Sequence, residues 1–223
     1  QWYTFARNRW YTFTGILIKI YADINIVLCD GSNFDFSLIV KNQFPNANIE
    51  CLYFNNSSSL VSLYGKGYGE GEIVKYALDN SIILNKYNSF SKCTSKLWLV
   101  NYFEYVKAWS GHLFLCDCCI ASYRKIFNIK PAFVDTRFYI TNKSFYQKHL
   151  SLAYLNVRDA DGYFLEHCFK DIIVTENIKR YISPVSLVLQ GVSGSSGLSY
   201  NVVRKSKTKE LSKKFILRIN GLL

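Results

Sequence analysis

The sequence predicts an α/β fold, a mixed sheet flanked by helices, in a single domain with a basic C-terminal tail. Apolar, strand-like segments alternate with segments of helical periodicity along the chain, which is typical of a sheet layered with helices. A length of 223 residues fits one domain and buries a sizeable core. Hydrophobic residues make up 49% of the chain and aromatic residues 17%, which excludes an intrinsically disordered protein.

The elements expected from hydrophobic periodicity and turn residues begin after residue 22. Predicted strands cover 23–29, 49–54, 90–100, 112–118 and 132–141. Predicted helices cover 36–43, 72–80, 102–108, 143–150 and 162–171. Residues 1–22 are aromatic and basic without clear periodicity, so we divide the chain into this atypical segment, a domain over 23–200 and a basic amphipathic tail over 201–223. Because the chain begins at Gln1 and contains no Met, we expect a fragment or a processed form.

Two predicted turns are candidates for nucleotide binding. Asp30-Gly31-Ser32 ends the first predicted strand, the position where ligands bind in open α/β sheets. Residues 65–71 contain four glycines at alternate positions, which would let the backbone approach a phosphate at the start of the helix over 72–80. The glycine spacing matches neither the dinucleotide fingerprint nor a Walker loop, and an Asp-Gly pair is also a common plain turn.

Charged residues later in the chain occur as three close pairs: Lys92 with Lys96, Asp135 with Arg137, and Glu166 with His167. Asp135 and Arg137 share one face of an apolar predicted strand, which is unfavourable unless they pair or serve a function. Glu166 has aromatic and apolar neighbours, so its pKa is expected to be raised and it can act as a general base. The structural alternative is an Asp135–Arg137 ion pair and a buried, hydrogen-bonded His167.

Seven cysteines are spread along the chain, several of them in apolar runs. We expect them to be reduced core residues. The cluster of cysteines at 116–119 has no second pair at the spacing that a structural zinc site requires.

The positive charge is concentrated in the tail. The formal net charge is +11, and residues 204–218 contain seven basic residues and one acidic residue. Leu211, Phe215, Leu217 and Ile219 make a short basic amphipathic helix plausible, which would gain about 1 kcal/mol per basic residue at an anionic membrane surface. With no apolar run of about 18 residues and no cleavable signal pattern, we expect a cytoplasmic protein, peripheral at the inner face of a membrane. A solvated tail is the alternative.

Taken in order, these segments resemble nucleotide-sugar-dependent glycosyltransferases of the GT-A fold, of the kind that builds bacterial capsule and lipopolysaccharide. The resemblance covers about 23–200. Residues 29–33 resemble the "DDGSxD" turn of family-two enzymes, 65–81 the helix that precedes the donor site, 90–98 a "K-x-TGR-Y" strand, 134–139 a "DxRF" strand, and 162–167 the acceptor-side segment that carries an "ED" or "EH" pair.

The resemblance implies transfer of a sugar from a nucleotide-sugar donor to a glycan or lipid-linked glycan. Asp30, Gly31 and Ser32 would contact the nucleotide. The cations that stabilise the departing diphosphate would be Lys92, Lys96 and Arg137. The catalytic residues would be Glu166, His167 and Asp135, with Glu166 or His167 taking the proton of the acceptor hydroxyl if the enzyme inverts.

The resemblance also implies a divalent metal, Mn²⁺ or Mg²⁺. GT-A enzymes bind it through an Asp-x-Asp motif, which is missing at the expected place in this chain. Asp117 and Asp135 are the available substitutes, so the metal ligands stay unassigned.

Two other functions compete with this interpretation. The basic, aromatic composition also fits a nucleic-acid-binding module. Most aromatic residues lie in core-like apolar runs and are not interleaved with Lys and Arg, as a stacking platform requires, so no nucleic acid is expected as a partner. The other alternative is a degenerate, non-catalytic glycosyltransferase relative that acts as a partner subunit.

Overall fold

A computed structural model describes residues 24–94, 97–115, 117–120, 127, 129, 131–192, 199–200 and 207–223. The atypical segment 1–22 and Lys96 lie outside the described residues, as does the junction between domain and tail at 201–206.

The first described elements form a parallel β–α–β unit. β1 (Ile26–Asp30) pairs in parallel with β2 (Ile49–Tyr53), and α2 (Ser37–Gln43) connects them. Phe36 and Val40 are buried between this helix and the two strands. The structure confirms the predicted strand, helix and second strand to within a few residues.

Three helices follow β2: α3 (Ser58–Tyr64), α4 (Lys66–Asn80) and α5 (Ile82–Asn85). The predicted glycine-rich turn over 65–71 is wrong, because α4 begins at Lys66 and contains the later glycines. These glycines allow close packing, since a Cβ on Gly71 would lie only 2.1 Å from Tyr154 Cβ. Gly65 alone keeps a turn conformation, with a φ of +107° that favours glycine.

The other described strands are antiparallel and form small sheets. One contains β3 (Ser89–Cys93), β8 (Phe138–Asn142) and β5 (Leu113–Leu115); another contains β10 (Ser199–Tyr200), β9 (Leu189–Val192) and β4 (Leu97–Leu99); the last pairs β6 (Cys118–Ile120) with β7 (Pro131–Val134). The predicted strands 90–100, 112–118 and 132–141 are each wrong in one respect. The predicted strand 90–100 covers both β3 and β4, and 132–141 covers parts of both β7 and β8. The predicted strand 112–118 covers β5 and reaches the first residue of β6. In each case the two observed strands belong to different sheets.

The later helices are α6 (Tyr102–Ala108), α7 (Lys143–Phe145) with a π-helical turn over Tyr146–Leu150, α8 (Leu165–Thr175) and α9 (Lys207–Ile219), with 3₁₀ turns over Ala153–Asn156 and Asp159–Asp161. The predicted helix 102–108 is confirmed, and α7 with its π-helical turn covers 143–150. The predicted helix over 162–171 begins later than expected, at Leu165.

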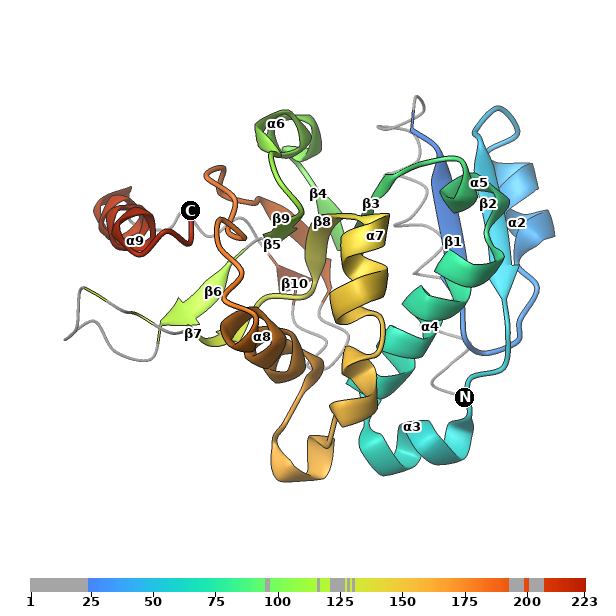
Figure 1. The fold of residues 1–223 in the computed structure, drawn as a ribbon. Coiled ribbons are helices and arrows are strands. Elements are labelled where there is room, and N and C mark those ends of the chain that lie inside the picture. The colour runs from blue at the N-terminus through green and yellow to red at the C-terminus, as the bar shows by residue number, and fades with distance from the viewer. Residues whose placement is uncertain are drawn as a thin grey trace.

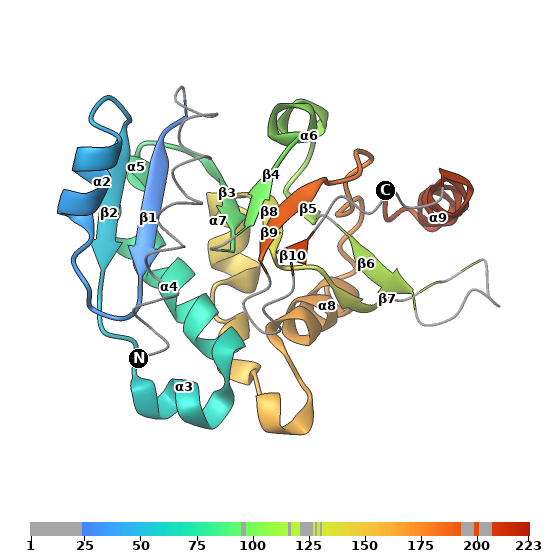
Figure 2. The ribbon, with the colours of Figure 1, turned by 180° about the vertical axis from the view of Figure 1, so that it is seen from behind.

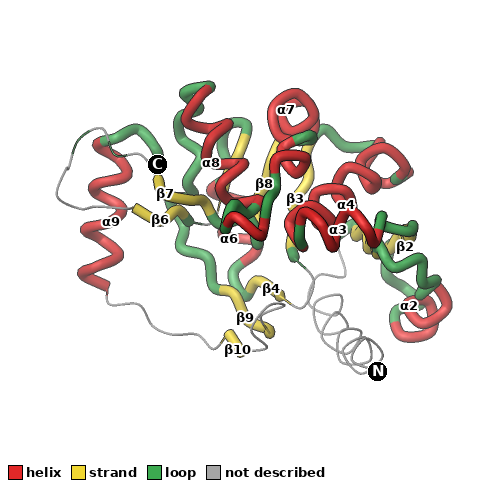
Figure 3. The backbone as a smooth tube through the Cα atoms, turned by 90° about the horizontal axis from the view of Figure 1, so that it is seen from below, coloured by secondary structure: helices red, strands yellow, loops and turns green. Residues whose placement is uncertain are grey.

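The helices and sheets are arranged in layers. α7 and α8 lie in front of the antiparallel strands in Figure 1. Figure 2 shows the opposite side, on which β9 and β10 lie in front. Seen from below, β3 and β8 run between the helices α7 and α8 on one side and β4 and β9 on the other (Figure 3). α4 packs against β1, α8 and the 3₁₀ turn at 153–156, and so joins the parallel unit to the rest.

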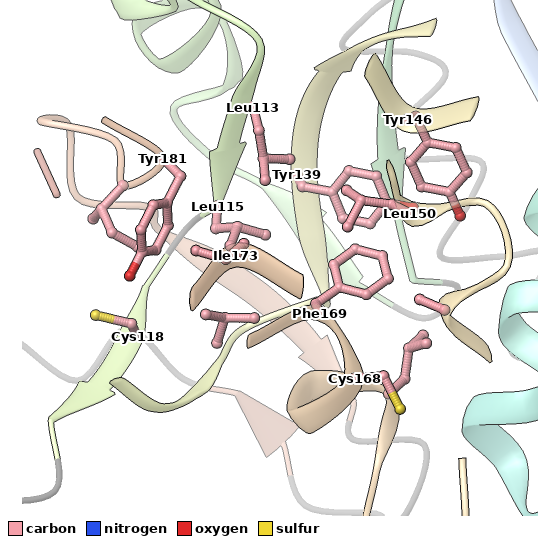
Figure 4. Close-up of a cluster of buried hydrophobic side chains, with 14 of the residues drawn as sticks. Leu113, Leu115, Cys118, Tyr139, Tyr146, Leu150, Cys168, Phe169, Ile173 and Tyr181 are labelled. Carbon is pink, nitrogen blue, oxygen red and sulfur yellow. The ribbon is translucent and has the colours of Figure 1, made fainter. Parts of the chain in front are cut away.

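The main core is rich in aromatic side chains. Tyr139, Tyr146 and Phe169 lie together there, with the Tyr139 and Tyr146 rings 6.0 Å apart (Figure 4). Cys168 belongs to the same cluster, and burial raises its pKa to about 11, which keeps the thiol protonated. The described residues therefore show a mixed α/β fold of small parallel and antiparallel sheets covered by helices, where the sequence predicts one mixed sheet. None of the described helices combines the length and hydropathy of a transmembrane span.

The close packing at Gly71 gives a first testable prediction. Gly71→Ala should lower the free energy of unfolding by about 1–3 kcal/mol, because the new Cβ would overlap the Tyr154 side chain near its backbone. The sign is informative, since Ala in place of Gly normally stabilises a helix by about 1 kcal/mol. Urea denaturation measures the change. Lys75→Ala on the exposed side of the same helix is the control and should change it by less than about 0.5 kcal/mol.

Candidate functional site

The connection between β7 and β8 carries two of the predicted residues. Asp135 and Arg137 lie in this connection and not on the face of a continuous strand, which corrects the sequence prediction. The carboxylate of Asp135 accepts hydrogen bonds from the Arg137 backbone N–H at 3.0 Å and from Arg137 Nε at 2.9 Å, and it forms an ion pair with the same guanidinium. The predicted pairing of the two residues is present, in a tight local turn around Thr136.

Lys92 approaches the same turn from β3. Its side chain is only 10% exposed, so its charge requires close partners. Lys92 Nζ donates to the Thr136 carbonyl oxygen at 2.9 Å and to Thr94 Oγ1 at 2.8 Å, and it forms an ion pair with Glu70 of α4. Glu70 could not be selected from sequence, because the glycine pattern around it predicts a turn and not a helix.

Glu166 lies in the first turn of α8, on the other side of Thr136. The Thr136 hydroxyl donates to Glu166 Oε1 at 3.2 Å. Burial raises the pKa of Glu166, and the carboxylates of Glu70 and Asp135 raise it further, while hydrogen bonds from its own backbone N–H and from Thr136 act in the opposite direction. The result is a carboxyl group whose pKa lies above its ordinary value, which makes it a stronger proton acceptor than an exposed glutamate.

Thr136 is therefore the centre of the site, and it is 2% exposed. Its carbonyl oxygen accepts a hydrogen bond from Lys92 Nζ, and its hydroxyl donates one to Glu166 Oε1. Asp135 and Arg137 flank it in the chain. Four predicted residues thus meet around one residue that the sequence did not single out. We call Lys92, Glu70, Asp135, Thr136, Arg137 and Glu166 the Thr136 cluster.

The Asp30-Gly31-Ser32 turn forms a separate group at the carboxyl end of β1. Asp30 Oδ1 accepts the Ser32 backbone N–H at 2.6 Å and also bonds the Ser32 hydroxyl, as in a plain Asp-Gly turn. Gly31 lies against Asn56, whose Nδ2 donates to the Gly69 carbonyl at 3.1 Å.

The first turns of α4 connect the two groups. Gly69 contacts the Asp30 turn through Asn56, and the next residue, Glu70, binds Lys92 in the Thr136 cluster. Asn56 Oδ1 is buried and has no hydrogen-bond partner among the described residues. Two of the predicted sets of residues are therefore held by adjacent positions of one helix.

His167 makes different contacts from Glu166. Its Nδ1 accepts the Phe164 backbone N–H at 3.1 Å, so the ring caps the start of α8. The ring also stacks on Tyr163, with ring centres 5.5 Å apart. These contacts fit a structural role, and they leave Glu166 as the group with a direct bond to Thr136.

The glycine-rich segment does not form the loop on which the predicted phosphate site depends. The start of α4 is already capped, because the Lys66 backbone N–H donates to Asp159 Oδ2 at 3.0 Å. A carboxylate in this position takes the place that a phosphate would need.

The described residues also do not fit a divalent metal. They contain no group of three or more His, Cys, Asp or Glu side chains close enough to hold an ion. The suggested substitutes are each engaged, Asp117 with Lys213 and Asp135 with Arg137. The prediction of Mn²⁺ or Mg²⁺ stays a prediction.

A depression of about 320 Å³ lies elsewhere, at α7 and its π-helical turn, lined by His112, Ser144, Phe145, Lys148 and His149. None of the predicted site residues lines it. The Thr136 cluster is identified by its charges and hydrogen bonds and not by this hollow.

The geometry defines an α/β protein with a half-buried acid–base cluster next to a turn at the end of a parallel strand. Comparisons with protein families, with curated proteins and with solved structures found no match. The functional interpretation therefore depends on the residues themselves.

The raised pKa of Glu166 predicts a cost in stability. Because the pKa of Glu166 is higher in the folded than in the unfolded state, the folded protein favours the protonated carboxyl. The protein is therefore relatively more stable at pH values below the unfolded pKa, and it loses this stability as pH rises through the folded pKa. Glu166→Gln removes the charge at every pH, so it should raise the melting temperature at neutral pH by a few degrees, where about 1 kcal/mol corresponds to roughly 2–4 °C. The gain should vanish in acid. Calorimetry at neutral and at acid pH measures the melting temperatures of the variant and the wild type. An equal gain at the two pH values would contradict a raised pKa of Glu166.

Proposed function

We propose that the protein is a glycosyltransferase that moves a sugar from a nucleotide-sugar donor to a hydroxyl group of a surface polysaccharide, capsule or lipopolysaccharide. The observation that carries the proposal is the Glu166 carboxyl, whose pKa is raised and which Thr136 holds in the same cluster as Lys92 and Arg137. A base and cations brought together in this way suit a reaction that removes a proton from one oxygen and releases a phosphate on another.

In the proposed reaction, the acceptor oxygen forms a bond to the anomeric carbon of the donor sugar. The bond from that carbon to the diphosphate oxygen breaks, and its electron pair leaves with the diphosphate. Glu166 takes the proton of the acceptor hydroxyl, as in an inverting transfer. His167 is the weaker candidate for the base, because its Nδ1 already accepts the Phe164 backbone N–H.

The cations have different roles in this proposal. The Arg137 side chain is 37% exposed, so it can reach a diphosphate while its Nε stays on Asp135. Lys92 is 10% exposed and bound to Glu70, so it holds the Thr136 turn in position. Lys96 lies outside the described residues and stays a proposed donor-binding cation. Asp30, Gly31 and Ser32 would bind the nucleotide at the end of β1.

We also propose that the reaction takes place in the cytoplasm, at the inner face of a membrane, where glycan or lipid-linked glycan acceptors are found. The distribution of charge in the chain supports this location, since seven of the 27 basic residues lie within 204–218.

Glu166→Gln should reduce transfer by at least about 10²–10⁴-fold and leave donor binding unchanged. The amide keeps the size of the side chain and can still accept the Thr136 hydrogen bond, but it cannot take a proton. Product formation and donor binding by calorimetry are the two measurements. Glu104→Gln, an exposed carboxylate on α6, is the matched control and should transfer like the wild type. Wild-type turnover in Glu166→Gln would remove Glu166 as the base.

Thr136→Val tests the hydroxyl that binds this base. The hydrogen bond from Thr136 stabilises the ionised carboxylate and lowers its pKa, so its loss should raise the pKa of Glu166 further. The rate of transfer rises with pH as Glu166 ionises, and this rise should move to higher pH in the variant. The pH profile of kcat measures the change, and an unmoved profile would show that Glu166 does not control the rate.

A thermal-shift screen with UDP-, GDP- and CMP-sugars, with and without Mn²⁺, tests the donor class. Stabilisation by one donor supports a glycosyltransferase. Stabilisation by none of them, together with salt-sensitive binding of single-stranded oligonucleotides, would replace the proposal by the nucleic-acid-binding alternative. Donor binding without transfer to any acceptor would favour the non-catalytic relative.

A further inference from the structure

Helix α9 is attached to the body of the protein by one of its faces. Leu217 is 2% exposed and belongs to the main core, as does Leu222 just beyond the helix. Lys213 Nζ donates to the Cys118 carbonyl oxygen at 2.7 Å and pairs with Asp117. The fold therefore already uses this face for packing and for an ion pair.

A second face of α9 carries large apolar side chains that the fold does not bury. Leu211 is 67% exposed, Phe215 64% and Ile219 40%. They follow one another at intervals of four residues, which places them in one stripe along the helix. An aromatic and two aliphatic side chains in one exposed stripe are more than the scattered apolar residues of an ordinary surface. We call these three residues the α9 stripe.

The surroundings of the α9 stripe are basic. Arg218 lies between Phe215 and Ile219 in the sequence and is exposed, and residues 204–218 contain seven basic residues and one acidic residue. Within α9 itself, Lys207, Lys209, Lys213, Lys214 and Arg218 are basic and only Glu210 is acidic.

Ile129, between β6 and β7 in the sequence, lies close to the end of α9. The Ile129 backbone N–H donates to Asn220 Oδ1 at 2.9 Å, which places Ile129 next to the end of the helix. Phe127, two residues before Ile129, is 68% exposed. Figures 1 and 2 both show α9 with β6 and β7 at one end of the molecule, away from α2 and β2.

We propose that this end of the protein binds an anionic lipid bilayer, with the α9 stripe and Phe127 inserted at the boundary between headgroups and acyl chains. An exposed apolar stripe and an excess of Lys and Arg are the two features by which an amphipathic helix binds such a surface. A second copy of the chain is a poorer occupant, because it would bring two basic surfaces together. A free polyanion would use the charge and leave the apolar side chains in water.

The test is co-sedimentation of the full chain with vesicles of phosphatidylcholine alone or mixed with phosphatidylserine. The protein should bind the mixed vesicles and bind pure phosphatidylcholine much less. The double variant Leu211→Ser, Phe215→Ser should bind the mixed vesicles at least about tenfold more weakly, because two large apolar side chains no longer insert. Both side chains are exposed, so the melting temperature should not fall.

Leu38→Ser with Leu63→Ser is the matched control. These side chains are 71% and 64% exposed on α2 and α3, and the control should bind like the wild type. Equal binding by the stripe variant and the wild type, or competition by oligonucleotides with no effect of the apolar substitutions, would overturn the proposal. The proposal would also be overturned if the wild-type protein did not bind the vesicles and self-associated through the α9 stripe. The assay measures binding and not transfer, so its outcome is independent of the proposed glycosyltransferase activity.

Discussion

The arrangement of the site depends on the contacts of the partly buried ammonium group of Lys92. This group joins three parts of the chain that are far apart in sequence: β3, which carries it; α4, which supplies Glu70; and the β7–β8 connection, which supplies the Thr136 carbonyl. A charge that is 10% exposed must keep such partners, because removing one leaves an uncompensated charge at a cost of about 3–5 kcal/mol. Lys92 therefore holds the turn around Thr136 at a fixed place, and the Thr136 hydroxyl then binds Glu166.

Much of this site follows from sequence, and the part that does not has a physical reason. Asp135, Arg137 and Glu166 could be selected because a charge in an apolar segment requires a partner. Lys92 could be selected because residues 90–98 resemble a strand of glycosyltransferases. Glu70 could not, since its glycine neighbours predict a turn while tertiary packing against Tyr154 makes that segment a helix. Local periodicity predicts where apolar segments lie but not where they break, so the interruption at Asp135–Arg137, which forms the site, was predicted as continuous strand.

Glu166 shows how stability and function oppose each other in the cluster. Burial and two neighbouring carboxylates disfavour its ionised form, and the Thr136 hydroxyl and the start of α8 only partly offset this. A Gln at this position would suit the fold better. A half-buried carboxyl group whose ionised form is disfavoured supports the chemical role proposed for it.

The charges of the Thr136 cluster limit what it can bind by itself. Lys92 and Arg137 give two positive charges and the three carboxylates of Glu70, Asp135 and Glu166 give three negative charges, so the described cluster has a formal charge of −1 when Glu166 is ionised. A diphosphate brings further negative charge, and it would be repelled unless other cations meet it. In the proposed reaction that charge would come from Lys96, the further donor-binding cation of the proposal. The strongly basic α9 end does not serve this purpose, because Lys213 is bound to Asp117 and the α9 stripe is apolar. The proposed diphosphate and the proposed membrane surface would therefore be bound by different parts of the chain, the first at the Thr136 cluster with a further cation and the second at α9.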